Sequence, residues 1–295
     1  MDVVWTVLGA VLIALTLRDI FEMLFHPLGR GRIGRMVIRA VASACGAAAT
    51  RRPSFKVIAG PLSFIAVVAT WATLLIVGWA LVFFPHLPEG FRFAPGLDPS
   101  GHSGFDDALY VSLVNLTSLG YGDISPESAL LRIMGPVEAL FGLGLLTASV
   151  SWLISIQSVV SRRDAFAHEV RLTRAAEGRI GERLADADPE LLERMLASYT
   201  EQLVAVRRDL MHFPITYWFR GEDDEHALSS MLPFLRDAVA EARSDHRPLA
   251  LKVRARMLEM AIDDFAETLR DRLQVPGETT EATLRHYQRQ VRARR

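Results

Sequence analysis

One stretch of the sequence lacks charged residues over a length that argues against a purely soluble fold. From Val57 to Pro88 there are 32 consecutive positions without Asp, Glu, Lys or Arg, and most of them are apolar. A helix of about 20 apolar residues is enough to cross the roughly 30 Å of hydrocarbon in a bilayer. This stretch therefore predicts a membrane-spanning helix.

Two further segments are candidates for crossing the membrane. Ala139–Ser161 has 23 positions without those charges and ends at Arg162 and Arg163, so it predicts a second span. Val3–Leu17 has only 15 uncharged residues before Arg18. A tilted span and an amphipathic helix at the membrane surface both fit this length, and we favour the span. A cleavable signal peptide fits poorly, because the basic start and the cleavage site are missing.

The charges beside these segments predict their orientation. Between Met23 and Lys56 there is no acidic residue, and seven residues are basic: Arg30, Arg32, Arg35, Arg39, Arg51, Arg52 and Lys56. Such a basic excess marks the cytoplasmic side of a membrane protein. Arg162 and Arg163 place the end of the later span on the same side. We therefore expect the loop between the two spans to lie outside and the C-terminus to be cytoplasmic.

Between the two firm spans lies a shorter apolar segment. Gly104–Leu116 is a predicted helix of 13 residues, with Ser103 as its N-cap and with Asp106 and Asp107 in its first turn. At 1.5 Å per residue it reaches only about 20 Å, so we expect a re-entrant segment that enters the membrane and returns. Its C-terminus, the negative end of the helix dipole, favours a cation there.

The run Thr117–Asp123, with the sequence TSLGYGD, follows this helix. Non-helical backbone at membrane depth is tolerated only where it lines a path or is buried in protein. Gly120 and Gly122 permit dihedral angles that turn consecutive carbonyl groups toward one axis. Such carbonyls can replace the water shell of a monovalent cation, and the Ser118 hydroxyl can add another oxygen.

The run resembles the filter of pore-loop potassium channels, in which T-[TS]-[VL]-G-Y-G-D follows a short pore helix. The region of resemblance is Val57 to Ser161, and the layout is similar to the prokaryotic type with two transmembrane helices and a pore loop, extended by an N-terminal helix. Because the chain has one loop, the resemblance implies a homotetramer. It also implies K⁺ sites at the oxygens of Ser118, Leu119, Gly120 and Tyr121, within an ion-binding filter of Thr117, Ser118, Leu119, Gly120, Tyr121 and Gly122.

The chain departs from the family pattern beside the filter. Ser118 replaces the commoner Thr, and Leu119 replaces the commoner Val. Val114 stands where some channels carry a Glu that braces the Asp after the filter, and Tyr110-Val111 replace paired aromatic residues. We expect potassium selectivity to survive these changes.

Several residues around the filter allow two interpretations. Asp123 could form a ring of four carboxylates at the outer mouth, or brace the pore helix. Gly142 and the nearby Gly144 could be a gating hinge, or let helices pack closely. One stripe of the later span could line the pore or face lipid and other helices: Leu146, Val150 and Ile154.

Other titratable residues have simpler interpretations. Glu138 lies in the outer turns of the later span, and we place it at the membrane interface. His86 and His102 lie in the outer loop, where we expect solvated histidines. The acidic run Glu222–Glu225 lacks the spacing of an EF-hand and is expected to begin a helix.

The sequence therefore predicts an all-α membrane protein with an outer helix, a re-entrant pore helix and filter, an inner helix and a cytoplasmic helical domain. The expected domains are an N-terminal hydrophobic helix (1–26), a basic cytoplasmic linker (27–56), the pore (57–161) and the helical domain (162–295). Two apolar stripes are expected to form a bundle, within one subunit or around the four-fold axis. Their residues are Leu192, Leu196, Tyr199, Leu203, Val206, Leu210 and Phe213, and Leu251, Leu258, Ile262, Phe265, Leu269 and Leu273.

Composition narrows the partners and excludes several classes. The net charge of −1 argues against nucleic-acid binding, and Cys45 alone cannot form an intrachain disulfide. Neither a Rossmann-type ligand-gating motif nor an arginine-rich voltage sensor is found. The basic tail from Arg285 could touch anionic lipid or be a disordered, solvated tail.

The expected protein is an integral membrane channel of a prokaryotic inner or plasma membrane that passes K⁺ passively. It has no enzymatic step and no organic cofactor, its partners are copies of itself and membrane lipid, and the residues do not identify its gating stimulus. The alternatives are a weakly selective cation channel and a membrane-anchored helical sensor or scaffold.

Overall fold

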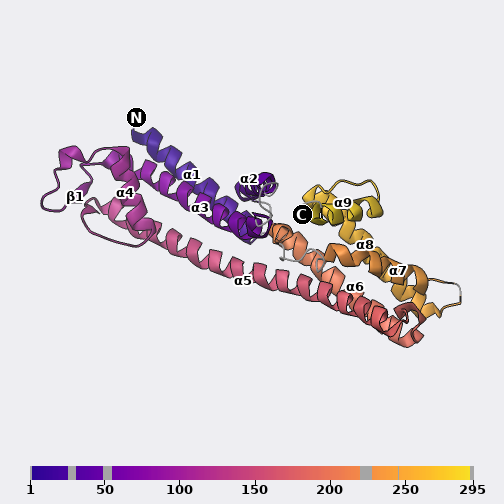
Figure 1. The fold of residues 1–295 in the computed structure, drawn as a ribbon. Helices are drawn as coiled ribbons and strands as arrows, with labels where there is room; N and C mark the ends of the chain where they lie inside the picture. The colour runs from indigo at the N-terminus through magenta and orange to yellow at the C-terminus, as the bar shows by residue number, and fades with distance from the viewer. Residues whose placement is uncertain (1, 26–30, 49–54, 220–227, 245, 293–295) are drawn as a thin grey trace. The chain divides into compact units, whose positions relative to one another are not determined.

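The computed structural model describes residues 2–25, 31–48, 55–219, 228–244 and 246–292. The protein is an all-α membrane protein, as predicted (Figure 1). Its α-helices are α1 (Asp2–Leu24), α2 (Arg32–Ala48), α3 (Phe55–Phe83), α4 (Phe105–Leu116), α5 (Ala129–Ile180), α6 (Pro189–His212), α7 (Leu228–Ala242), α8 (Leu249–Leu273) and α9 (Thr280–Arg292). Short 3₁₀ turns are η1 (Phe84–His86), η2 (Pro99–Gly101), η3 (Leu184–Asp186) and η4 (Pro214–Trp218). In the described ranges the β-structure is one antiparallel pair, β1 (Phe91–Phe93) with β2 (Ile124–Pro126).

The chain forms two compact units. The first, here called the pore unit, contains Met1–Arg39 and Phe64–Ile154, and the second, the helical unit, contains Ala40–Ser63 and Ser155–Arg295. The helices α1, α3 and α5 are long and apolar enough to cross a membrane. A fourth apolar helix, α4, has only 12 residues and is too short to do so.

In the pore unit, α1 lies antiparallel to α3 (Figure 1). The rings of Trp5 and Phe84 are 6.0 Å apart, and Asp19 accepts a hydrogen bond from Trp71 Nε1 at 2.9 Å. These contacts are about 21 Å apart along α1, because a helix rises 1.5 Å per residue. Between them Gly9 and Gly78 face each other, where a Cβ on Gly78 would lie 3.3 Å from the carbonyl oxygen of Gly9. This packing favours a span over an interfacial helix for the N-terminal segment.

Asp19 is a buried carboxylate that joins three helices. Besides Trp71 of α3, it accepts hydrogen bonds from the backbone amides of Ile33 (2.8 Å) and Gly34 (3.1 Å) in the first turn of α2. A buried carboxylate without partners is strongly destabilising, whereas amides at a helix N-terminus lack partners of their own. Asp19 therefore fixes where α2 begins relative to α1 and α3.

Aromatic side chains join α3 to α5. Trp152 packs against Phe64 and Trp71, with ring centroids 5.3 and 6.0 Å apart, and Phe141 packs against Trp79 at 6.0 Å. The helix α5 continues for 52 residues, well beyond the predicted span of Ala139–Ser161. Its C-terminal part belongs to the helical unit, so one uninterrupted helix links the two units.

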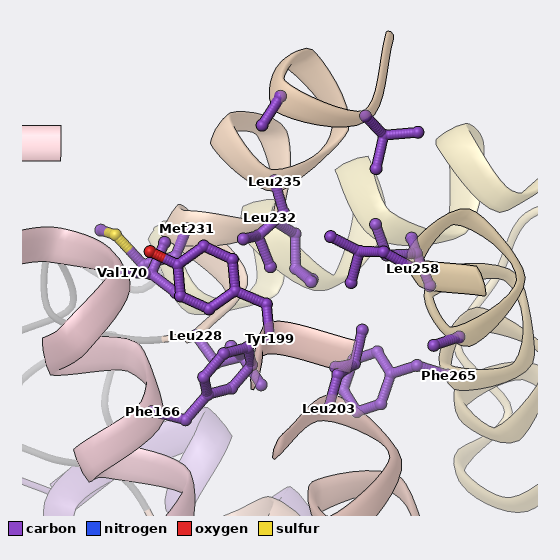
Figure 2. Packing of buried hydrophobic residues seen from close by; sticks show 14 of the residues in the cluster. Phe166, Val170, Tyr199, Leu203, Leu228, Met231, Leu232, Leu235, Leu258 and Phe265 are labelled. Carbon is purple, nitrogen blue, oxygen red and sulfur yellow. The ribbon is translucent and has the colours of Figure 1, made fainter. Parts of the chain in front are cut away.

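The helical unit has a single hydrophobic core (Figure 2). Tyr199, Leu203, Leu258 and Phe265 from the two predicted stripes meet in it, together with Phe166 of α5 and residues of α7. The two stripes therefore face each other within one chain, the first of the two arrangements that the sequence allowed. Of the predicted residues, Leu273 is only partly buried against this core, and Phe213 is not part of it.

The arginine pair that the sequence assigned to the membrane edge is also used in packing. Arg162 forms an ion pair with the buried Asp209 at 2.8 Å. Arg163 donates hydrogen bonds to the carbonyl oxygens of Thr216 and Phe219, both at 2.9 Å. Because those carbonyls end η4, the two arginines attach α5 to α6 and η4 inside the helical unit.

The structure decides one further sequence expectation, whereas others concern residues that it does not describe. The basic tail is helical through Arg292, so the disordered alternative is wrong for that part of it. The acidic run Glu222–Glu225 and the arginines at 30, 51 and 52 lie outside the described residues.

The core of the helical unit generates a paired stability prediction. Leu258 is fully buried, so Leu258→Ala should lower the free energy of unfolding by about 2–5 kcal/mol. Its neighbour Met257 is 43% exposed, and Met257→Ala should change it by less than about 1 kcal/mol. Thermal unfolding in detergent, followed by circular dichroism, compares the two. Equal shifts of the melting temperature would contradict this core.

Candidate functional site

The short helix α4 begins one residue later than the sequence indicated. Gly104, not Ser103, is its N-cap, because Gly104 has the extended backbone of a cap and donates its amide to Asp107 Oδ2 at 3.1 Å. The other oxygen of Asp107 lies 2.8 Å from His102 Nδ1, and the His102 ring stacks on Phe93 at 5.8 Å. The expectation of a solvated loop histidine is therefore wrong for His102.

At its other end α4 is closed by the first residues of the TSLGYGD run. The backbone amides of Thr117, Ser118 and Leu119 donate to the carbonyl oxygens of Leu113, Asn115 and Val114 at 2.9–3.1 Å. The Thr117 hydroxyl also donates to the Leu113 carbonyl at 2.6 Å. These bonds satisfy carbonyls that a helix end leaves without partners, and they fix the direction in which the chain leaves α4.

The backbone then alternates in handedness. Ser118, Gly120 and Gly122 have positive φ angles of 58°, 59° and 77°, whereas Leu119 and Tyr121 do not. In a strand, successive groups point to opposite sides. Reversing the sign of φ at every second residue lets successive carbonyls turn to the same side, which glycine permits at low energy. Serine lacks the β-branch that makes threonine strained at positive φ. The φ of Ser118 is therefore a local reason for serine in place of the commoner threonine.

The carbonyl oxygens of residues 117–122 have no hydrogen-bond partner within the described chain. Leu119 and Tyr121 are 57% and 68% exposed, and nothing lies within 4 Å of a Cβ placed on Gly120 or Gly122. A single chain therefore presents an uncovered row of acceptors, which could hold a cation. In the same described residues no cluster of His, Cys, Asp or Glu side chains could hold a metal ion.

Asp123 fixes the outer end of the run. Its carboxylate accepts hydrogen bonds from the Tyr110 hydroxyl at 2.5 Å and from the Ile124 amide at 3.0 Å, and its carbonyl accepts one from the Ala94 amide at 2.8 Å. The bond from Tyr110 lowers the pKa of Asp123, and the same bond raises the pKa of Tyr110 to about 12. Asp123 thus braces the pore helix, one of the two roles that the sequence left open.

Tyr110 is the residue that the sequence analysis missed. In the sequence it stands out only as part of the Tyr110-Val111 pair, which replaces two paired aromatic residues. Val114 lacks the carboxyl group that braces this Asp in some channels. The signal is its chemistry and position: a hydroxyl on the second turn of α4 can donate to a carboxylate at the end of the TSLGYGD run.

The inner helix α5 packs closely against the last turns of α4. A Cβ placed on Gly142 would overlap the carbonyl oxygen of Leu116, and one on Gly135 would lie 3.5 Å from the Asn115 amide nitrogen. The helix α5 continues through Gly142 without a break. Close packing, one of the two interpretations of Gly142, is thus present, and the hinge stays a prediction.

Glu138 lies between these two glycines and is covered by protein, whereas its sequence position suggested only the membrane interface. The side chain is fully buried, and its Oε1 lies 2.5 Å from the Ser112 hydroxyl of α4. The same hydroxyl lies 2.9 Å from the Ile76 carbonyl of α3. The sequence pattern does not show that α4, rather than lipid, covers Glu138.

The candidate pore-lining residues occupy a free face of α5. Leu146, Val150 and Ile154 are each more than half exposed in the single chain. Trp152, which packs against α3, lies two residues from Val150 and from Ile154, so it points to the opposite side of the helix. The three side chains therefore lie on the side of α5 that faces away from α3.

Comparisons with known proteins agree with a channel. A family profile described as “Ion channel” matches residues 69–157, which include α4 and the TSLGYGD run. An uncharacterized membrane protein, YdjJ of Bacillus subtilis (strain 168), is 31% identical over 112 residues, which are 38% of this chain and 32% of that protein. The match thus spans about a third of the length of that relative. No solved structure matches significantly. These findings support a pore-loop ion channel domain in a membrane protein.

The Tyr110 brace predicts a pH dependence. Because the hydrogen bond from Tyr110 lowers the pKa of Asp123, its ionised form persists to lower pH than that of an ordinary Asp, whose pKa is about 3.9. Ion flux should therefore be constant between external pH 8 and about 4.5. Tyr110→Phe removes the hydroxyl, so the acid loss of flux should begin at higher pH. Asp123→Asn, which cannot ionise, should remove this titration, and identical profiles for wild type and Tyr110→Phe would contradict the brace.

The contact at Gly142 predicts opposite effects of one substitution at two nearby glycines. Gly142→Ala forces the α5 backbone away from Leu116 and should destabilise the protein by about 1–3 kcal/mol. Gly144 has nothing within 4 Å, so Gly144→Ala should be neutral or stabilise α5 by up to about 1 kcal/mol. Thermal unfolding in detergent measures both. The close-packing role would be rejected if Gly144→Ala were the more harmful change.

Proposed function

We propose that the protein is a potassium-selective channel in which four copies of the chain surround one pore. The observation that carries this proposal is the row of unpaired carbonyl oxygens at residues 117–122, with φ alternating in sign at Ser118, Gly120 and Gly122. Non-helical backbone in a membrane needs partners, and a dehydrated cation is the partner that such a row fits. The proposed K⁺ sites are the oxygens of Ser118, Leu119, Gly120 and Tyr121.

The incompleteness of the site in one chain supports assembly of several copies, and the resemblance to pore-loop potassium channels implies four. A single run offers oxygens from one side only, and a closed four-fold ring of copies surrounds the ion. The exposure of Leu119 and Tyr121 supports this, because neighbouring copies would cover these side chains. The C-terminal end of α4 adds a partial negative charge that favours the cation.

The proposed four-fold arrangement also gives roles to residues outside the TSLGYGD run. Four Asp123 carboxylates would concentrate cations at the outer mouth, since Tyr110 keeps each one ionised. Leu146, Val150 and Ile154 would line the inner pore and form a hydrophobic constriction. Bending at Gly142 would open it, with the helical unit on the cytoplasmic side of an inner or plasma membrane. Conduction is passive and involves no cofactor.

Potassium flux from reconstituted vesicles tests the function. Wild type should pass K⁺ and exclude Na⁺, and Gly120→Ala should reduce K⁺ flux by at least about tenfold, because alanine is strained at a φ of 59°. The matched control is Gly101→Ala, a glycine of the outer loop where nothing lies within 4 Å. It should conduct like wild type, and size-exclusion chromatography should show the same assembly for all three proteins.

The outcomes separate the proposal from its alternatives. Equal flux of Na⁺ and K⁺ would indicate a weakly selective cation channel. Absence of any flux, with the protein folded and assembled, would indicate a membrane-anchored helical sensor or scaffold. Unchanged flux in Gly120→Ala would reject the filter itself.

A further inference from the structure

Three helices of the helical unit line a cavity. The helices α7 and α9 both pack on α8 and contact each other, and between the three lies a cavity of about 510 Å³. Its lining includes four buried apolar side chains: Leu232, Val239, Ile262 and Leu284. Sites for small organic molecules typically have volumes of about 300–1,000 Å³ and a largely apolar wall. The cavity therefore has the size and the wall of a small-molecule site.

Ser229 brings two oxygen atoms without their usual partners to this cavity. The side chain is 1% exposed, and its hydroxyl has no hydrogen-bond partner among the described residues. Pro233, which also lines the cavity, has no N–H group and cannot donate to the Ser229 carbonyl one turn before it. Buried polar atoms without partners are unfavourable and rare in native proteins. A hydrogen-bond donor bound in the cavity would supply the missing partner.

Charges of both signs line the cavity, and only some of them are paired. Two guanidinium or hydroxyl donors already hold acids of α8: Arg243 bonds to Glu259 at 2.7 and 2.8 Å, and the Thr280 hydroxyl bonds to Asp263 at 2.7 Å. Four charged side chains of the lining have no partner in the described chain: Arg236, Asp237, Glu281 and Arg285. A simple anion would meet the free acids, and a simple cation would meet the free arginines. A ligand that carries both charges can satisfy both.

The helix geometry brings one free charge toward the unpartnered hydroxyl. Arg236 follows Ser229 by seven residues, so the two lie on the same face of α7. Side chains on a helix lean toward its N-terminus, which directs the long Arg236 side chain back toward Ser229. Glu281 lines the cavity from α9, directly after Thr280, whose bond to Asp263 fixes that part of α9 beside α8.

We propose that this cavity binds a free α-amino acid with an apolar side chain. The Arg236 guanidinium pairs with the carboxylate of the ligand, because its planar donors match the two carboxylate oxygens. The ammonium group has three donors, and the Glu281 carboxylate and the two free oxygens of Ser229 accept them. The apolar side chain lies on the buried wall of the cavity. The proposal concerns the helical unit alone and does not depend on which ion the pore conducts.

Isothermal titration calorimetry of the full chain in detergent tests the site. L-leucine, L-methionine and L-phenylalanine are the probes, and at least one of them should bind. The N-acetyl and methyl ester derivatives of the best probe each lack one of the two charges, so both should bind at least about tenfold more weakly. Binding of none of the three amino acids, or equal binding of either derivative, would overturn the proposal.

Substitutions in the lining test each contact. Arg236→Gln and Glu281→Gln should each weaken the binding of the best probe by at least about tenfold, and both residues are exposed enough to be replaced without unfolding. Ser229→Ala should weaken it by about threefold, the effect of one neutral hydrogen bond. It should not lower the free energy of unfolding of the ligand-free protein, because the hydroxyl has no partner there.

Matched variants control for the loss of charge. Arg272 and Glu267 are exposed residues of α8 that do not line the cavity. Arg272→Gln and Glu267→Gln should each leave binding within about twofold of wild type. Losses in these controls as large as those in Arg236→Gln and Glu281→Gln would contradict the assigned contacts. Circular dichroism checks that each variant is folded.

Discussion

Backbone carbonyl groups that follow the end of a helix inside a membrane need new partners, and the pore unit contains six that have none among the described residues. Residues 117–122 are held at one end by the carbonyls of α4 and at the other by Asp123. Between these anchors, no donor in the described chain forms a hydrogen bond to the backbone carbonyl oxygens of residues 117–122. In hydrocarbon such a segment is unfavourable unless something else supplies the partner. The proposed occupant, a bare cation, is the consequence of that constraint.

The elements behind the run explain why it can keep this shape. Helix α4 ends at Leu116, directly before the row of free carbonyl groups at residues 117–122. Helix α5 approaches it so closely that a Cβ at position 142 would overlap the Leu116 carbonyl oxygen. Ser112 of α4 contacts the Ile76 carbonyl of α3 on one side and Glu138 of α5 on the other. Helix α4 therefore contacts both long helices through one residue, Ser112, four residues before its end. Polar contacts inside a membrane protein are retained where they fix geometry of this kind.

The helical unit has its own core and a direct attachment to the inner helix. Its apolar stripes close on each other in one chain, so the unit does not depend on other copies for its core. The pair Arg162 and Arg163, placed where α5 enters the unit, binds Asp209 and the end of η4. The sequence predicts membrane orientation from these two charges, and the structure shows that both side chains also bind within the helical unit.

The sequence by itself determined the all-α membrane fold, the re-entrant position of α4 and the stripes of the helical core, since hydrophobic length and periodicity depend only on the order of residues. It also located the TSLGYGD run. Tertiary structure decided which residues meet across the chain: Tyr110 with Asp123, Asp19 with Trp71 and the start of α2, and Glu138 buried under α4. These contacts join segments far apart in the sequence, and a hydrogen bond between them leaves no periodic trace. Burial of Glu138 could not be read from its span, because hydropathy does not tell whether lipid or protein covers a residue.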